Sequence, residues 1–584
     1  MSDTKTKISG KNTDQQWDTK IEYILACVSY GVGLGNLWRF PYLVYSQKGL
    51  TFLIPYFICL FLIGIPFAVL EGALGQFSGF GSIKLFKIAP MFEGIGWGQV
   101  LLCFYCCVYY NIICAYNLYY LIISIPWNFV KLFTGEWILP YDNNSTYCSE
   151  TYPSKDYYNK THPEANPSCQ EDFYNTQVLV DSNDFFQGLT SIQWHIFGCL
   201  LVAWAIVYYG QSRSAKTVGK LSYITAILPY FCLTSLLIVT FQQKGAFSVG
   251  LRTYMTIDFE YLFDPSMTIW IRAAEQIFYS QGVVWGVLVV FSSHNKFKFD
   301  IFRHNFRLSC INAASSLYGS LIIFATLGML AYDRFEGDEN MAREKFGDVV
   351  GQNQKLIFIL YPLALTKMPF STIWAIIFFG MMVCLAIGSQ TGMFMAYFEG
   401  ILEKLSHFKY DAGKRNLFLI YSILFSIICA LPMVTSAGSQ WVSLYNDSLC
   451  CFSIFIFAFL EIICISWYYG IDKMILDIEK MIGGRLPFRQ FWKITWKYLT
   501  FGMTIFLIGA QFKYYGSQSW LISKDWPLGM NLFGWGFIQA TQIAPLFYFV
   551  YKNRGMGTQD IYFRRSRDDE EESSSSEDKI PLKF

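Results

Sequence analysis

Long apolar stretches recur along the whole chain, and they constrain its fold more than any other feature. A helix of roughly 20 apolar residues crosses the hydrocarbon layer of a bilayer, which is about 30 Å thick. Such stretches lie near residues 21–46, 51–73, 98–125, 193–209, 219–241, 267–293, 308–331, 370–400, 415–434, 441–468, 493–513 and 530–552. Because a backbone in lipid must satisfy its own hydrogen bonds, they predict an all-α integral membrane protein with twelve transmembrane helices.

Composition argues against several other classes of protein. Of the 584 residues, 53% are hydrophobic and 15% are charged, whereas soluble domains are charged at about a quarter of their positions. This hydropathy excludes a soluble binding module. The 45 basic and 43 acidic residues lack the clustered positive charge that nucleic-acid phosphates attract. The 5 histidines are scattered and no His or Cys cluster has metal-site spacing, so we do not expect an enzyme.

The loops between the stretches carry basic residues on one side of the membrane. These residues are Lys84, Lys87, Arg213, Lys216, Lys220, Lys296, Lys298, Arg303, Lys404, Lys409, Lys414 and Arg415. Short loops rich in Lys and Arg face the cytoplasm. With an even number of spans, we expect both termini on the cytoplasmic side of the plasma membrane.

The chain then divides into a membrane domain and two tails. Residues 1–20 are polar, unlike a cleavable leader, and form the expected cytoplasmic N-terminal tail before the twelve-helix domain at 21–552. The cytoplasmic tail at 553–584 is acidic and Ser-rich. This composition predicts either a disordered, phosphorylated segment that binds cytoplasmic partners or a solvated tail without a specific role.

One long polar loop, at about 126–190, is expected outside the cell. It carries glycan acceptor triplets at Asn143, Asn144 and Asn159. Cys148 and Cys169 lie in the same loop. Because that side of the membrane is oxidising, we predict a disulfide between them.

Two of the expected spans are interrupted by glycines. In the first, Gly31, Gly33 and Gly35 alternate before Asn36 and Arg39. The sixth contains the polar and small residues Gln276, Ser280, Gln281, Gly282 and Gly286. Close packing of helices on small residues is one explanation. A charge such as Arg39 needs a watery cavity or a partner, and so favours the other explanation, a solute site at two unwound helices.

The run at 33–42, GLGNLWRFPY, and several later segments all resemble the same protein family. The later segments are Ile65-Pro66, Leu70-Glu71, Gly75-Gln76, Tyr109-Tyr110-Asn111, Gln276-Ile277-Phe278, Phe291-Ser292-Ser293, Asn295-Lys296-Phe297, Tyr361-Pro362, Ala364-Leu365 and Ser466-Trp467-Tyr468-Tyr469-Gly470. Together they resemble the neurotransmitter:sodium symporter (solute carrier 6) family, in its amino-acid-transporter-like branch. The resemblance implies a five-plus-five inverted repeat with two further helices, helices 1 and 6 unwound at the midplane, alternating access and sodium-driven uptake.

The resemblance also implies two sodium sites, because sodium sheds its water only where several oxygens replace it. The first site corresponds to Gly31, Asn36, Ser280 and Asn312. The second corresponds to Ser29, Val32, Leu385 and Ser389. At Gly388, relatives have an aspartate or a hydroxyl residue. Either a water fills this gap or the coupling ratio falls to one sodium.

Chloride dependence is a further implication of the family pattern. The corresponding ligands are Tyr56, Gln276, Ser280, Asn312 and Ser316. Ser316 is neutral where chloride-independent relatives have a carboxylate. A mobile anion would then offset the sodium charge in a medium of low dielectric constant.

The class of substrate depends on Gly33. Monoamine carriers that resemble this chain have an aspartate there, so here the substrate must bring its own carboxylate. That carboxylate would meet the first sodium, the amides around Gly33 and Gly35, and the Tyr110 hydroxyl. The family pattern completes the pocket with Gly31, Cys106, Tyr279, Gly282, Trp285, Ser389 and Met393. Because Trp285 is bulkier than the usual phenylalanine, whereas Gly282 is permissive, we expect a reshaped pocket for a small or medium neutral amino acid.

Two gates follow from the same pattern. The outer gate corresponds to Arg39 with Asp447, under a lid of Tyr110 and Tyr279, and a shift of one residue would place Asn446 there instead. The inner gate departs from the family, because its residues are the acids Asp14 and Glu403, which cannot form an ion pair. Either Lys11 or Lys20 substitutes, or the inward-open state is more populated.

Three hypotheses about function stay open. The first is a sodium- and chloride-coupled amino-acid symporter. The second is a carrier for betaine, taurine or a GABA-like solute. The third is a non-transporting membrane partner or receptor-like relative, which Gly388, Asp14 and the altered sixth span suggest.

Overall fold

All regular structure in the described part of the chain is helical. The computed structural model describes residues 16–126, 138–142, 145, 148, 169–180, 185–213, 215–350, 356–405, 411–449, 452–517, 519–524 and 526–553. Within these ranges no strand occurs, and an isolated bridge pairs Ile192 with Thr435. The prediction of an all-α fold is therefore confirmed.

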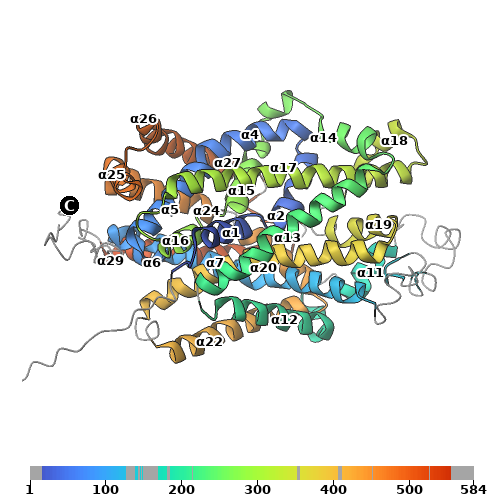
Figure 1. Ribbon diagram of the computed structural model, residues 1–584, viewed down its shortest axis with the longest axis horizontal. Helices are drawn as coiled ribbons and strands as arrows, with labels where there is room; N and C mark the ends of the chain where they lie inside the picture. Colours follow the sequence, from blue (N-terminus) through green and yellow to red (C-terminus); the bar gives the residue numbers. More distant parts are fainter. Residues whose placement is uncertain are drawn as a thin grey trace, which may run out of the picture.

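The first half of the chain forms helices that run back and forth through the molecule (Figure 1). They are α1 (Lys20–Gly31), α2 (Leu34–Leu37), α3 (Arg39–Ser46), α4 (Leu53–Cys59), α5 (Ile65–Ser78), α6 (Ser82–Leu85), α7 (Glu93–Ser124), α11 (Cys169–Phe173), α12 (Trp194–Gln211), α13 (Ala215–Phe241) and α14 (Arg252–Tyr254). A 3-10 turn at Gly49–Phe52 leads into α4, and a π-helical turn at Leu60–Gly64 joins α4 to α5 in one long helix.

The second half of the chain is helical as well. Its helices are α15 (Thr268–Gln281), α16 (Val287–Ser293), α17 (Ile301–Arg334), α18 (Glu339–Glu344), α19 (Tyr361–Thr366), α20 (Ser371–Lys404), α22 (Ala412–Ala430), α23 (Gly438–Leu449), α24 (Ser453–Ile463), α25 (Ile471–Ile482), α26 (Arg489–Ile494), α27 (Thr500–Ser517), α28 (Leu528–Phe533) and α29 (Ala540–Lys552).

Among the described residues, eight helices are long and apolar enough to cross a bilayer. They are Gly49–Ser78, Pro90–Ser124, Trp194–Gln211, Ala215–Phe241, Ile301–Arg334, Ser371–Lys404, Ala412–Val434 and Gly438–Ile482. The chain is therefore a multi-pass membrane protein. The expected first and sixth spans are missing from this set because each is divided, the first into α1, α2 and α3 and the sixth into α15 and α16.

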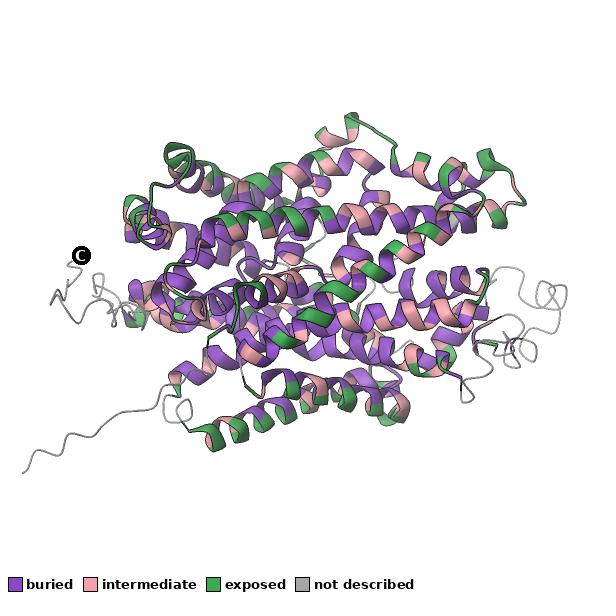
Figure 2. Cartoon of the chain, viewed as in Figure 1, coloured by how far each residue is buried: buried purple, intermediate pink, exposed green. Residues whose placement is uncertain are grey.

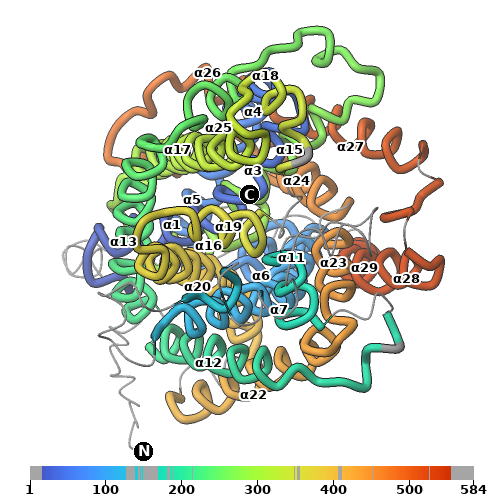
Figure 3. Tube along the Cα trace, turned by 90° about the vertical axis from the view of Figure 1, so that its right-hand side faces the viewer, coloured from blue at the N-terminus to red at the C-terminus, as the bar shows by residue number. Residues whose placement is uncertain are grey.

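Helices in the centre of the bundle differ in burial from those at its edge (Figure 2). In the most apolar window of the α7 span 94% of residues are buried, against 39% for α13 and α22. Apolar side chains such as Ile224 and Phe231 on α13 point outward, where a bilayer would cover them. Viewed along the bundle, α12, α13 and α22 lie at the edge (Figure 3), and α7 packs closely against α20.

The expected cytoplasmic loops gather at one end of the bundle. Lys404, at the end of α20, forms an ion pair with Glu93 at the start of α7. Arg415, at the start of α22, pairs with Glu399 at 3.2 Å. These contacts place several of the basic loops on one side of the protein, as the sequence predicts.

Candidate functional site

The first span is broken beside a bundle of polar side chains. α1 ends at Gly31 and α2 begins at Leu34, and between them Gly33 has an extended backbone (φ −108°, ψ −167°). The break leaves backbone groups without helical partners, which is the arrangement that a solute site in a membrane protein requires.

The expected sixth span is broken over five residues between α15 and α16. Gly282, Val284 and Gly286 all have left-handed backbone conformations, with φ of 61°, 69° and 75°. Glycine adopts this conformation readily, whereas the branched side chain of Val284 makes it strained. Both interruptions predicted from the glycines are therefore present in the structure.

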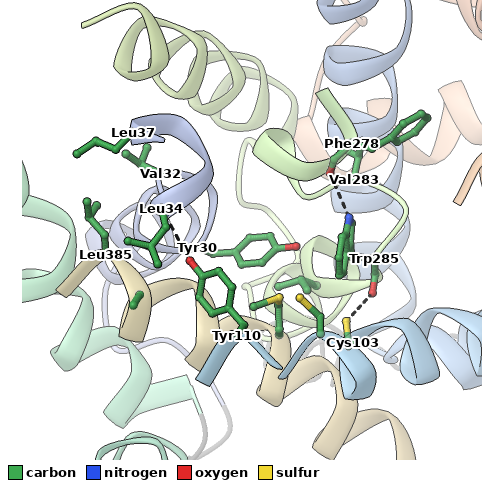
Figure 4. Packing of buried hydrophobic residues seen from close by; sticks show 14 of the residues in the cluster. Tyr30, Val32, Leu34, Leu37, Cys103, Tyr110, Phe278, Val283, Trp285 and Leu385 are labelled. Atoms are coloured by element: carbon green, nitrogen blue, oxygen red, sulfur yellow. Dashed lines mark hydrogen bonds between the residues drawn. The ribbon is translucent and has the colours of Figure 1, made fainter. Parts of the chain in front are cut away.

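Tyr30, which the sequence analysis did not single out, connects the two breaks (Figure 4). Its hydroxyl donates a hydrogen bond to the Gly282 carbonyl at 3.2 Å. A Cβ atom on Gly282 would lie 2.2 Å from the Tyr30 ring, and one on Gly392 would lie 2.8 Å from it. Only glycine fits at these two positions while Tyr30 keeps its place.

The residues of the first predicted sodium site lie together. Asn36 Nδ2 donates to Asn312 Oδ1 at 2.6 Å, and Asn312 Nδ2 donates to the Ser280 carbonyl at 2.5 Å. A Cβ on Gly31 would be 3.5 Å from both Asn312 Nδ2 and the Ser280 carbonyl. Asn36 Oδ1 and Ser280 Oγ are buried without a hydrogen-bond partner in the described structure. Such unpaired oxygens are costly unless a ligand satisfies them.

The second predicted sodium site is arranged differently. A Cβ on Gly388 would lie 2.2 Å from Ser29 Oγ, so the Ser29 hydroxyl occupies the space of the absent side chain. Ser29 Oγ is hydrogen-bonded to Thr225 Oγ1 at 2.6 Å, and Ser389 Oγ donates to the Tyr30 carbonyl at 2.9 Å. The Ser389 hydroxyl, which is the predicted side-chain ligand, therefore has a protein partner, whereas Ser29 is expected to contribute its carbonyl rather than its hydroxyl. Val32 and Leu385 of this set are buried nearby (Figure 4).

The five residues predicted to bind chloride are all buried. The Tyr56 hydroxyl faces the hydroxyls of Ser280 and Ser316. Tyr56 OH, Ser280 Oγ and both amide atoms of Gln276 lack hydrogen-bond partners among the described residues. Ser316 Oγ makes only a long bond to the Asn312 carbonyl, at 3.3 Å. Several hydrogen-bond donors therefore converge at a place where an anion could accept their hydrogen bonds.

Around Gly33, two hydroxyl groups converge on the predicted carboxylate site. A Cβ on Gly33 would lie 2.3 Å from Ser389 Oγ and 3.3 Å from the Tyr110 hydroxyl, so even alanine would crowd this place. Tyr110 accepts a hydrogen bond from the Leu34 amide at 3.4 Å. A Cβ on Gly35 would meet no atom within 4 Å. The space beside this turn is therefore open at Gly35 and closed at Gly33.

The indole of Trp285 is fixed inside the second break. Its Nε1 donates to the Phe278 carbonyl at 3.1 Å, and its carbonyl accepts from Cys103 Sγ at 3.2 Å. Its ring centroid lies 5.7 Å from that of Tyr279. Of the other predicted pocket residues, Cys106 and Met393 are buried. Trp285 is thus anchored both at its indole nitrogen and at its backbone carbonyl.

At the predicted outer gate, the carboxylate that contacts Arg39 belongs to Glu275. Arg39 Nη2 lies 3.1 Å from Glu275 Oε2, and its guanidinium is 4.2 Å from the Tyr279 ring centroid. Arg272 shares the same carboxylate oxygen at 2.9 Å. Asp447 accepts a hydrogen bond from Asn446 at 2.8 Å and lies within electrostatic range of both arginines.

Sequence reasoning missed Glu275, although a signal for it was present. Glu275 and Tyr279 are four residues apart in α15 and so share one face of the helix. An acid on the face of a lid tyrosine is a candidate partner for Arg39.

At the predicted inner gate, Glu403 contacts the backbone beside the start of α6. Its Oε1 accepts a hydrogen bond from the Gly81 amide at 2.9 Å. Trp17 closes the same end, where its Nε1 donates to the Phe291 carbonyl at 2.9 Å. Asp14 and Lys11 lie outside the described residues.

In the long loop, Cys148 and Cys169 form a disulfide with their Cα atoms 5.8 Å apart. The predicted disulfide is confirmed. The glycan triplets at Asn143, Asn144 and Asn159 lie outside the described residues.

Comparison with known proteins agrees with the broken-helix site. The chain is 32% identical to the sodium- and chloride-dependent glycine transporter 2 of Xenopus laevis over 561 residues, covering 92% of this chain and 69% of that protein. It is 31% identical to glycine transporter 1 of Xenopus laevis over 504 residues, covering 84% and 77%. It is 30% identical to the sodium- and chloride-dependent GABA transporter ine of Drosophila melanogaster over 554 residues, covering 93% and 56%.

The family assignment follows from these relatives and from residues 14–554, which match the sequence model of a single protein family. This chain belongs to the sodium:neurotransmitter symporter family, and it is a transporter rather than an enzyme.

Proposed function

We propose that the chain is a sodium- and chloride-dependent symporter that takes up a small carboxylate-bearing solute, most favourably a neutral amino acid. The observation that carries this proposal is the group of unpaired buried polar atoms on Asn36, Tyr56, Gln276 and Ser280 beside the two breaks. Oxygens suit a sodium ion, and O–H or N–H donors suit a chloride ion, so one polar region serves both.

The proposed transporter has twelve spans in a five-plus-five inverted repeat. Its unwound segments lie at the midplane of the plasma membrane, and both termini lie in the cytoplasm. The two breaks support this arrangement because they occur in the first helix of each repeat. Alternating access exposes the site to either side, and the membrane potential contributes roughly 2.3 kcal/mol per net charge for each 100 mV.

Sodium coupling rests mainly on the first site. There, Asn36 and Ser280 keep unpaired oxygens, whereas Ser29 and Ser389 in the second site are bonded to protein. At the second site Gly388 brings no side-chain oxygen, and the Ser29 hydroxyl occupies the space where one would lie. We therefore favour one tightly bound sodium at the first site.

Chloride completes the charge balance beside that sodium. The hydroxyl groups of Tyr56, Ser280 and Ser316 come from α4, α15 and α17 and face one another, and the amide of Gln276, one helical turn before Ser280 in α15, is buried as well. In an interior of low dielectric constant, an anion there stabilises the nearby cation more strongly than it would in water.

Substrate size is limited by three aromatic side chains. Tyr30 packs on Gly282, Trp285 is held by two hydrogen bonds, and Tyr110 stands beside Gly33. Gly33 carries no charge for an amine, so the substrate carboxylate supplies recognition through sodium and Tyr110. A neutral amino acid with a small side chain fits this pocket best.

A betaine-, taurine- or GABA-like solute is the second candidate, and the similarity to the Drosophila melanogaster GABA transporter favours it. Such a solute would use the same ion sites and extend past Gly35 rather than toward Trp285.

The test is a radiolabelled uptake screen in cells that express the chain at the surface, with sodium and chloride replaced separately. The proposal predicts saturable uptake of a small neutral amino acid that requires both ions. Competition by GABA or betaine, but not by amino acids, would favour the second candidate. No uptake and no sodium-dependent current despite surface expression would leave the non-transporting hypothesis.

A further inference from the structure

Two glutamates lie fully buried in the interior, away from the ion-binding residues discussed above. Glu71 is on α5 and Glu461 is on α24, and neither side chain is exposed to solvent. The two carboxyl groups are close enough to interact electrostatically. Gln99 of α7, also fully buried, donates from Nε2 to Glu461 Oε2 at 3.0 Å.

No positive charge compensates this pair in the part of the chain that the structure describes. Neither glutamate forms an ion pair there with a lysine, an arginine or a histidine, unlike Glu93, Glu275 and Glu399. Burying one ionised carboxylate without a counter-charge costs several kcal/mol, by rough estimate. Two such charges side by side would also repel each other.

The hydrogen-bond donors around the pair are too few for two ionised groups. Glu461 Oε1, both oxygens of Glu71 and Gln99 Oε1 lack hydrogen-bond partners among the described residues. An ionised carboxylate only accepts hydrogen bonds, whereas a protonated one also donates. One bound proton would thus supply a donor that this group of acceptors lacks.

The remaining titratable neighbours do not supply a positive charge. Tyr30 of α1 interacts with Glu71, and Cys464, just after α24, interacts with Glu461. Both are neutral when protonated and negative when not. Neither group can therefore offset the charge of an ionised carboxylate.

We propose that Glu71 and Glu461 form a proton-binding site that holds one proton at neutral pH, mainly on Glu461. Glu71 faces the backbone N–H groups of Val284 and Gly286 without hydrogen-bond geometry to either, and these dipoles favour the charged form there. Glu461 has a single amide donor, from Gln99. As a coupled pair, the two groups share their titration.

This proton site adjoins the break between α15 and α16. Val284 and Gly286 belong to the break between α15 and α16, and a Cβ on Gly286 would lie 2.9 Å from Gln99 Oε1. The proton therefore neutralises a carboxyl group directly behind the segment that carries Trp285 and Gly282.

Infrared spectroscopy of the purified full-length protein tests this inference without any substrate. The carbonyl stretching band of a protonated carboxyl group, shifted in heavy water, is expected in the wild type at neutral pH and expected to lose most of its intensity in Glu461→Gln. Glu93→Gln is the matched control, because Glu93 is ion-paired with Lys404, and it should keep the band. A wild type without the band, or a Glu461→Gln spectrum identical to the wild type, would overturn the proposal.

A second measurement does not depend on band assignment. A carboxyl group that keeps its proton in the folded protein but loses it on unfolding makes stability fall as pH rises above about 4.3. Thermal unfolding in detergent should therefore show Glu461→Gln becoming more stable relative to the wild type as pH increases. A stability difference that stays constant with pH would contradict the bound proton. Neither measurement depends on uptake, so failure of the proposed transport function would be distinguishable from failure of the proposed proton site.

Discussion

The first predicted sodium site and the region around Gly388 contain similar polar residues but differ in how many of their oxygen atoms are hydrogen-bonded. In the first, Asn36 Oδ1 and Ser280 Oγ are buried without partners in the described structure. Around Gly388, the hydroxyls of Ser29 and Ser389 are both hydrogen-bonded to protein. An unsatisfied buried polar group costs about 1–3 kcal/mol, so the first region gains more from an ion. Unpaired oxygens, rather than hydroxyl residues as such, mark the site that depends on its ligand.

Replacing Asn36 by Ala should have the largest effect. It removes a ligand of the first sodium and the partner of Asn312. A hydrogen bond or ligand contact to a charged group contributes about 1.5–3 kcal/mol, which is a loss of roughly 10- to 150-fold in sodium affinity. Sodium-dependent uptake at matched surface expression measures this effect. Uptake unchanged from the wild type would refute the assignment of the first site.

Ser316→Glu should remove the requirement for chloride. A carboxylate at this position supplies the negative charge that the mobile anion otherwise brings to the group of Tyr56 and Gln276. Uptake measured with chloride replaced by gluconate should then match uptake in chloride, whereas the Ser316→Ala control should keep the chloride requirement. A variant that still needs chloride would count against the chloride site.

The double variant Ser29→Gly with Gly388→Asp should give the second region a ligand. Removing the Ser29 hydroxyl relieves the closest contact, at 2.2 Å from where the Cβ of residue 388 would be, and the Ser29 carbonyl oxygen, at 2.7 Å, must shift as well. Wild-type uptake should rise hyperbolically with sodium concentration, and the double variant should become sigmoidal. Gly388→Asp alone is the control, and it should fold poorly because of the clash. A sigmoidal dependence of wild-type uptake on sodium concentration would contradict the proposal that one sodium ion drives transport.

Glu275→Gln should have a smaller effect than these. It removes the charge that holds Arg39 and Arg272, a partly buried contact. Partly exposed ion pairs contribute about 1 kcal/mol or less, so apparent substrate affinity should fall by roughly fivefold. Asp447→Asn is the matched comparison. If Asp447→Asn weakens affinity more than Glu275→Gln does, the acid predicted from the sequence is the better gate partner.

The helical fold and most of the site follow from short-range features of the sequence. Apolar length predicts helices, alternating glycines predict the first break, and the motif around Asn36 predicts which polar residues meet. These features lie within one helix or repeat a known local pattern. The disulfide between Cys148 and Cys169 was likewise predictable from their position in one polar loop.

Other contacts were not predictable because they depend on how distant helices face one another. Tyr30 reaches Gly282, Ser29 fills the space beside Gly388, and both pairs join residues far apart in the chain. The helix face that Glu275 shares with Tyr279 makes it a candidate, but its contact with Arg39 depends on how α15 packs against α3. Helix rotation and depth determine these contacts, and hydropathy does not fix either.

Equilibrium binding of radioactive sodium to the purified protein most directly tests the difference between the two regions. Wild type should bind sodium more tightly in chloride than in gluconate. Asn36→Ala should lose this binding, whereas Thr225→Val, which removes only the partner of Ser29, should bind sodium within about threefold of wild type, less than 1 kcal/mol. Equal sodium binding by Asn36→Ala and wild type, or a larger loss in Thr225→Val, would contradict the assignment of sodium coupling to the first site.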